Sequence, residues 1–143
     1  MTFSVSEKQS IYAVRASLFR GTVVLRVLCV DDDPGFLEML KTLLKKRGYD
    51  VLLAGSGMEA LSLLEETLPD VILLDIMMPG MDGWETLRRI RERGCRVPVI
   101  VLTVLYEPEY REKSLAAGAD AVIPKPVERA ILFKTIECLL NDA

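Results

Sequence analysis

The chain has 143 residues, a length that fits one domain, and 50% of them are hydrophobic, which is enough for a buried core. Its 18 basic and 21 acidic side chains give a net charge of −3, so the chain has no electrostatic attraction for nucleic acid phosphates. This balance argues against direct nucleic acid binding and against disorder along the whole chain.

Cysteine and histidine usage removes several kinds of chemistry. The three cysteines, Cys29, Cys95 and Cys138, are far apart without CxxC spacing, and the chain has no histidine to complete a zinc site. Catalytic triads that use histidine are excluded, and any phosphohistidine must belong to a partner. No apolar run is long enough to span a membrane, and Glu7 and Arg15 interrupt what would be a signal peptide. We expect a reduced, cytoplasmic chain with no membrane partner.

Short apolar runs alternate with segments of helical periodicity from residue 25 onward. In chain order, we expect strand 25–30, helix 34–47, strand 51–54, helix 58–66, strand 71–74, helix 84–93, strand 99–102, helix 108–117, strand 121–123 and helix 128–140. The strands are hydrophobic throughout, as strands covered on both faces are. This alternation predicts an α/β fold, a doubly wound five-stranded parallel sheet with helices on both faces.

Local patterns indicate where two of the helices begin. Asp33 before Pro34 fits an N-cap, and Ser56 with Glu59 three residues later fits a capping box. We therefore interpret Asp33 as a cap rather than a ligand. The segment 6–19 could form a weak amphipathic helix, although a segment without caps or much burial is more often mobile.

Polar side chains follow the expected strands at the carboxyl edge, where doubly wound folds bind ligands. They are Asp31, Asp32, Asp33, Asp75, Thr103 and Lys125. If the first and third strands are neighbours, Asp75 faces the first acids across about 4.8 Å. Carboxylates at this range need a cation, and oxygen ligands favour Mg²⁺. Asp75 could then meet an incoming phosphoryl group as a nucleophile, with Thr103 and Lys125 contacting the phosphoryl oxygens.

Four motifs, each after its own strand, give the sequence a specific resemblance. They are VDDDP, LLDIMMPGMDG, IVLT and KP, in that order. The sequence resembles the receiver domain of two-component response regulators from about residue 25 to the C-terminus. The resemblance implies the flavodoxin-like strand order 2-1-3-4-5. It divides the chain into an N-terminal extension at 1–23 and a phosphoacceptor receiver domain at 24–143.

The resemblance also implies a set of Mg²⁺ ligands. Asp32 and Asp75 would coordinate the ion directly, Asp31 would do so through water, and the backbone carbonyl of Met77 would complete the protein ligands.

The same resemblance implies a reaction. Asp75 would accept a phosphoryl group, Lys125 would pair with Asp75 or its phosphoryl group, and the Thr103 hydroxyl would bind a phosphoryl oxygen. The peptide between Lys125 and Pro126 would be cis. The donor would be a sensor histidine kinase or a histidine phosphotransfer protein, and a downstream protein would receive the signal. Such a domain is not an enzyme in the usual sense, since it catalyses only its own phosphorylation and dephosphorylation; a homodimer is left open.

Some positions depart from the family pattern. Val122 and Val127 stand where the family often has aromatic residues, which puts the usual conformational switch in doubt. Met77 and Leu105 are apolar at two positions that tune hydrolysis of the phosphoryl group in the family. We therefore expect a long-lived phosphoryl-aspartate.

Other functions compete with this interpretation. A flavin site would need hydroxyl and glycine residues after the first strand, where the sequence DDDPG repels a phosphate. A Mg²⁺-dependent phosphatase would place its aspartyl nucleophile after the first strand, whereas the nucleophile expected here, Asp75, follows the third. A chemically silent receiver-like interaction module, or a receiver that is part of a larger regulator or hybrid kinase, remains open.

Overall fold

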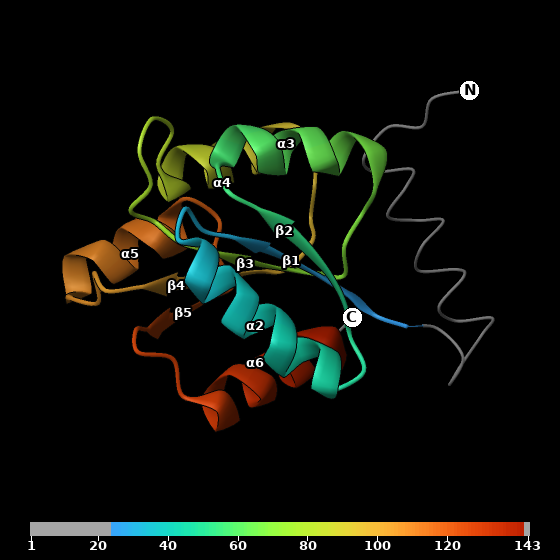
Figure 1. The fold of residues 1–143 in the computed structure, drawn as a ribbon. Helices are drawn as coiled ribbons and strands as arrows, with labels where there is room; N and C mark the ends of the chain where they lie inside the picture. The colour runs from blue at the N-terminus through green and yellow to red at the C-terminus, as the bar shows by residue number, and fades with distance from the viewer. Residues whose placement is uncertain (1–23, 142–143) are drawn as a thin grey trace.

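The computed structural model describes residues 24–141, and these form a parallel sheet between two layers of helices (Figure 1). The strands are β1 Arg26–Val30, β2 Asp50–Ala54, β3 Val71–Leu74, β4 Val99–Thr103 and β5 Ala121–Pro124. The helices are α2 Pro34–Lys46, α3 Gly57–Glu66, α4 Gly83–Glu92, α5 Pro108–Ala116 and α6 Arg129–Asn141. The strand order is β2-β1-β3-β4-β5, so the predicted flavodoxin-like topology is confirmed.

Alternate residues of each strand face opposite helical layers, so the sheet has a core on each side. Leu28 and Val30 of β1 lie in one cluster with residues of α3 and α4, whereas Val27 and Cys29 lie in the other with residues of α2 and α6. Cys29 is fully buried and packs as a small core residue. Because both faces are covered, the strands are hydrophobic without alternation.

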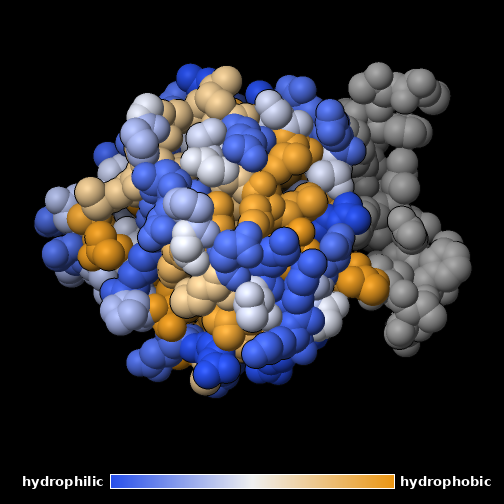
Figure 2. Space-filling model, in the orientation of Figure 1, coloured by the Kyte–Doolittle hydropathy of each residue, from blue (hydrophilic) through white to orange (hydrophobic). Residues whose placement is uncertain are grey.

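The β2 strand forms one edge of the sheet. Its residues Val51, Leu52 and Leu53 are half-buried, in contrast to the fully buried β3. Figure 2 shows hydrophobic atoms gathered in the middle of the visible face, where β2 runs between α2 and α3, with hydrophilic side chains around them. The edge position therefore explains why an apolar strand is incompletely covered.

Polar side chains fix the first turns of the helices. The Asp33 carboxylate accepts hydrogen bonds from the backbone N–H groups two and three residues later, so the predicted N-cap is confirmed. Ser56 accepts from the Glu59 N–H at 3.1 Å, but the Glu59 carboxylate accepts from the Gly55 N–H at 3.2 Å. The predicted capping box therefore differs in its second bond, because the glutamate reaches one residue further back than Ser56. Such caps contribute about 1 kcal/mol each.

Element boundaries differ from the predictions by one residue at several ends. The β4 strand continues through Thr103, which pairs with Pro124 of β5, so the predicted ends of both strands were one residue early. A hydroxyl side chain does not interrupt a backbone ladder, which is why the strand extends past the apolar run. The predicted helix 6–19 lies outside the described residues. Within 24–141, no helix has both the length and the apolar character needed to cross a membrane.

Candidate functional site

Three carboxylates meet at the carboxyl edge of the sheet. Asp31 and Asp32 follow β1, and Asp75 follows β3, which pairs directly with β1. The Asp75 N–H donates to the Val30 carbonyl at 2.9 Å and so continues the ladder to the end of both strands. Each of the three acids offers an oxygen within 4.8 Å of the others. Oxygen donors at this spacing can hold a divalent cation.

Burial differs sharply among these acids. Asp31 is 2% exposed and Asp75 is 7% exposed, whereas Asp32 is open to solvent. The Asp31 carboxylate accepts a hydrogen bond from the Asp33 N–H at 2.9 Å, which holds it against the start of α2. Two carboxylates of the cluster are thus buried, and the third, Asp32, is accessible to a solvated ion.

Lys125 reaches the acid cluster from the end of β5. Its Nζ lies 2.7 Å from Asp31 Oδ2 and 3.4 Å from Asp75 Oδ1, and its side chain is 18% exposed. The Lys125 N–H donates to the Thr103 carbonyl at 2.9 Å, and the peptide to Pro126 is cis, as predicted. The ammonium lies closer to Asp31 than to Asp75, although the resemblance points to Asp75 as its partner. One cation therefore bridges the two buried acids.

The pKa of the Asp75 carboxyl is raised above its ordinary value. Burial is the main cause, Lys125 opposes it, and the charge of Asp31 adds to it. A buried carboxylate near a second acid is costly to ionise, even with one ammonium nearby. The site therefore gains from any further positive charge placed beside Asp75.

Thr103 lies in the same region, at the end of β4. Its side chain is 1% exposed, and its Oγ1 accepts a hydrogen bond from the Leu105 N–H at 3.0 Å. A hydroxyl group can donate as well as accept, so this side chain can also contact an anionic oxygen. The order of strands brings Thr103, Lys125 and the acids to one edge of the sheet.

The loop from Asp75 to Gly83 is closed by hydrogen bonds to the residue after Asp75. The Gly83 and Met78 N–H groups both donate to the Ile76 carbonyl, at 2.8 and 3.1 Å. Met77 lies in this loop with its side chain 56% exposed. Asp82 ends the loop as the N-cap of α4, accepting from a backbone N–H at 2.9 Å, a role that the sequence analysis missed. The D-G-x-E pattern at 82–85 carries that signal.

Phe36 is a further residue beside the site that sequence reasoning did not identify. The ring centroid lies 4.2 Å from Lys125 Nζ. The two residues are far apart in the sequence, and no motif joins them.

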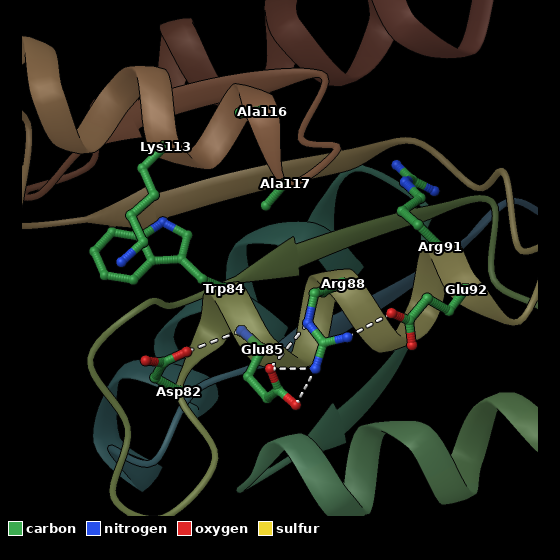
Figure 3. A pocket seen from close by; sticks show the side chains of 9 residues that line it. All are labelled: Asp82, Trp84, Glu85, Arg88, Arg91, Glu92, Lys113, Ala116 and Ala117. Atoms are coloured by element: carbon green, nitrogen blue, oxygen red, sulfur yellow. Dashed lines mark hydrogen bonds and ion pairs between the residues drawn. The ribbon is translucent and has the colours of Figure 1, made fainter.

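A groove of about 580 Å³ lies between α4 and α5 (Figure 3), and Asp31, Asp32 and Asp75 are not among its lining residues. Trp84 anchors the two helices here: its indole N–H donates to Ser114 Oγ at 2.9 Å, and its ring stacks on Tyr110 at 6.0 Å. Lys113 Nζ lies 4.0 Å from the Trp84 ring centroid. Along α4, the groove's charges are paired, with Arg88 between two glutamates.

A flavodoxin-like sheet with acids after β1 and β3 and a lysine after β5 defines a class of signalling domain, the receiver. The chain belongs to this family: residues 27–137 match the response regulator receiver domain. It is 41% identical over 117 residues to the response regulator MprA of Mycobacterium leprae (strain TN), covering 82% of this chain and 51% of that protein. The chain thus spans about half the length of the curated relatives it matches.

Solved structures are similar in fold and sequence. The receiver domain of the Francisella response regulator 1452 has a TM-score of 0.79 and 33% identity, covering 82% of this chain and 98% of that one. Vibrio cholerae chemotaxis protein CheY4 has a TM-score of 0.77 and 32% identity, covering 82% and 100%. The signal receiver domain of a signal transduction histidine kinase from Syntrophus aciditrophicus has a TM-score of 0.78 and 35% identity, covering 84% and 92%.

Proposed function

We propose that this receiver domain accepts a phosphoryl group on Asp75 in a Mg²⁺-dependent reaction and signals to a protein partner through a change of its surface. The observation that carries the proposal is the group of three carboxylates within 4.8 Å, two of them bridged by Lys125. The buried Asp75 carboxyl, with its raised pKa, beside a lysine at a ligand-binding edge, favours a chemical role over simple solvation.

The donor set fits Mg²⁺. This ion keeps several waters and is bound through one or two carboxylates. The exposed Asp32 beside the buried Asp75 fits this coordination preference. We propose that Asp32, Asp75 and the Met77 carbonyl hold the ion directly and that Asp31 does so through water. When bound, the ion neutralises the acids and polarises phosphoryl oxygens.

In the proposed reaction, an oxygen of the Asp75 carboxylate attacks phosphorus and forms a P–O bond, while the P–N bond of a phosphohistidine breaks and its electron pair returns to the imidazole. Lys125 and the Thr103 hydroxyl stabilise charge on the transferred oxygens. These 143 residues contain no histidine, so the phosphohistidine lies outside them, and we propose a sensor histidine kinase or a histidine phosphotransfer protein as the donor.

We propose that the receiver unit spans 24–143 and follows an N-terminal extension at 1–23. A second candidate is that this unit forms part of a larger regulator or hybrid kinase. Two similarities favour it: the MprA relatives are about twice as long as the matched region, and one similar structure is the receiver domain of a histidine kinase.

The test is incubation with acetyl phosphate while the intact mass is followed over time. We expect a gain of one phosphoryl group that requires Mg²⁺ and is absent from Asp75→Asn. The Asp33→Asn variant is the matched control, because it changes a neighbouring acid that caps α2, and it should still be phosphorylated.

If acetyl phosphate gives no mass gain, binding of beryllium fluoride with Mg²⁺ decides between two explanations. Binding to the wild type and not to Asp75→Asn would support an acceptor site that uses only its protein donor. Failure of both would overturn the proposal in favour of a silent interaction module.

The two apolar side chains near Asp75 predict slow hydrolysis of the phosphoryl group. Met77 and Leu105 both line a hollow of about 450 Å³ beside the loop after β3, and neither can orient an attacking water. The double variant Met77→Asn with Leu105→Glu should lose its phosphoryl group about tenfold faster or more, since positioned acid–base groups contribute at least this much. The decay of the intact mass after removal of the donor measures this. Fast decay in the wild type, unchanged in the variant, would contradict the prediction.

A further inference from the structure

We infer that Phe36 is a positioning residue for Lys125, holding the lysine ammonium in the acid site with the face of its ring. The inference rests on the proposed function and adds a residue to it. The basis is the 4.2 Å distance between Lys125 Nζ and the centre of the Phe36 ring. A cation over an aromatic face is attracted by the ring quadrupole within about 6 Å.

The backbone of Phe36 is linked to Asp31 through Asp33. Its N–H donates to the Asp33 carboxylate at 3.3 Å, and the Asp33 N–H donates to the Asp31 carboxylate at 2.9 Å. The ring is half-buried and packs against the core cluster shared by α2 and α6. Phe36 is thus attached to the site through two hydrogen bonds and has apolar support on one side.

Among the described residues, the Lys125 ammonium contacts the side chains of Asp31, Asp75 and Phe36, which come from three parts of the fold. Asp31, which follows β1, lies 2.7 Å from the lysine Nζ, and Asp75, which follows β3, lies 3.4 Å from it. Phe36 belongs to the first turn of α2. The lysine side chain is only 18% exposed. Because cation–π attraction strengthens when the cation is desolvated, the ring contact here is worth more than one on an open surface.

The ring differs from the two carboxylates in one useful respect. In the proposed reaction both acids acquire a second partner, since Mg²⁺ draws on their charge and Asp75 takes the phosphoryl group. The aromatic face offers no oxygen to a hard ion, so it keeps its attraction for the ammonium throughout. Phe36 therefore keeps Lys125 at the site at the stage when the acids attract it least.

A ring that served only as packing would act differently. Leucine or a fluorinated phenylalanine would fill the same apolar position, whereas fluorination withdraws electron density from the ring face and weakens cation–π attraction alone. Progressive fluorination of one side chain therefore separates the two roles.

The experiment replaces Phe36 with mono-, di- and trifluorophenylalanine, and separately with leucine and tryptophan, and measures the rate of phosphorylation by acetyl phosphate with Mg²⁺. We expect the rate to fall stepwise with fluorination, by about three- to tenfold in total. Phe36→Leu should be as slow as the trifluoro form, and Phe36→Trp should stay near the wild type. The matched control is the same series at Phe133, whose ring centroid lies 4.2 Å from the Arg47 guanidinium. These substitutions should leave the rate unchanged.

A second readout does not depend on the reaction. In the Mg²⁺-free protein, NMR should give the Lys125 side-chain methylene protons an upfield ring-current shift that Phe36→Leu abolishes. A wild type that neither takes up a phosphoryl group nor binds beryllium fluoride with Mg²⁺ would overturn the proposed function. A normal phosphorylation rate that does not change with fluorination of Phe36, or the absence of the ring-current shift, would overturn the role of Phe36 alone.

Discussion

Replacing Lys125 with methionine should lower the free energy of unfolding of the metal-free protein by about 3 kcal/mol at neutral pH. The ammonium is the cation that bridges Asp31 and Asp75, at 2.7 and 3.4 Å, and both carboxylates are buried. Methionine keeps much of the apolar chain but leaves two like charges close together without a counterion. Urea unfolding of both proteins, in buffer with a chelator, measures the difference.

The loss should depend on pH in a defined direction. Burial already raises the pKa of Asp75 above 3.8, and Lys125 opposes that shift, so the variant should have a still higher folded-state pKa. A carboxyl whose pKa is raised by folding stabilises the fold below its unfolded pKa, and that stability declines as pH rises through the folded pKa. The two unfolding free energies should therefore converge below pH 3.8 and separate above it. A difference that stayed constant with pH would assign the loss to packing of the lysine chain instead.

Magnesium should partly rescue this variant. An ion bound among the acids supplies the missing positive charge, so Mg²⁺ should raise the unfolding free energy of Lys125→Met more than that of the wild type. The control is Lys113→Met, whose ammonium lies on the Trp84 ring between α4 and α5. It should lose about 1 kcal/mol or less and respond to Mg²⁺ as the wild type does. Equal responses in all three proteins would contradict competition between Lys125 and an ion at the acids, and no response in any of them would contradict a metal site there.

Much of the fold was predictable because the chain marks its elements locally. The apolar runs at β1, β3 and β4 are continuous, and caps or glycines stop the helices between them. The meeting of Asp31 with Asp75 also followed from sequence, since residues directly after neighbouring parallel strands must lie at one edge. Here the backbone alone fixes the position of a side chain, and a one-dimensional pattern is sufficient.

The details of the site depended on contacts between distant segments, which no pattern records. Lys125 lies nearer Asp31 than Asp75 because the reach of a long side chain, and not its strand position, decides its partner. The Phe36 ring meets that lysine only through the packing of α2 against the sheet. Nothing in the sequence marks Gly83 as special, and its close approach to backbone atoms appears only in three dimensions.

Substituting Gly83 with alanine should be the most disruptive small change in the loop that carries the site. An added Cβ would lie 2.2 Å from the Asp75 carbonyl oxygen and 2.7 Å from the Ile76 Cα, and both are backbone atoms that cannot rotate away. The Gly83 N–H also donates to the Ile76 carbonyl at 2.8 Å, so the start of α4 is bound to the residue after the proposed acceptor. The new methyl group must push α4 and this loop apart.

We expect Gly83→Ala to lose about 3 kcal/mol of unfolding free energy, at the upper end for overpacking. Its phosphorylation by acetyl phosphate should slow by about 100-fold, because a displacement of about 1 Å at the reacting group costs that much. Gly80→Ala is the matched control in the same loop: its φ is +75°, and no atom lies within 4 Å of an added Cβ. It should lose only about 1 kcal/mol, the cost of a left-handed backbone. Equal losses in the two variants would contradict a special requirement for close approach at Gly83, whose φ is not positive.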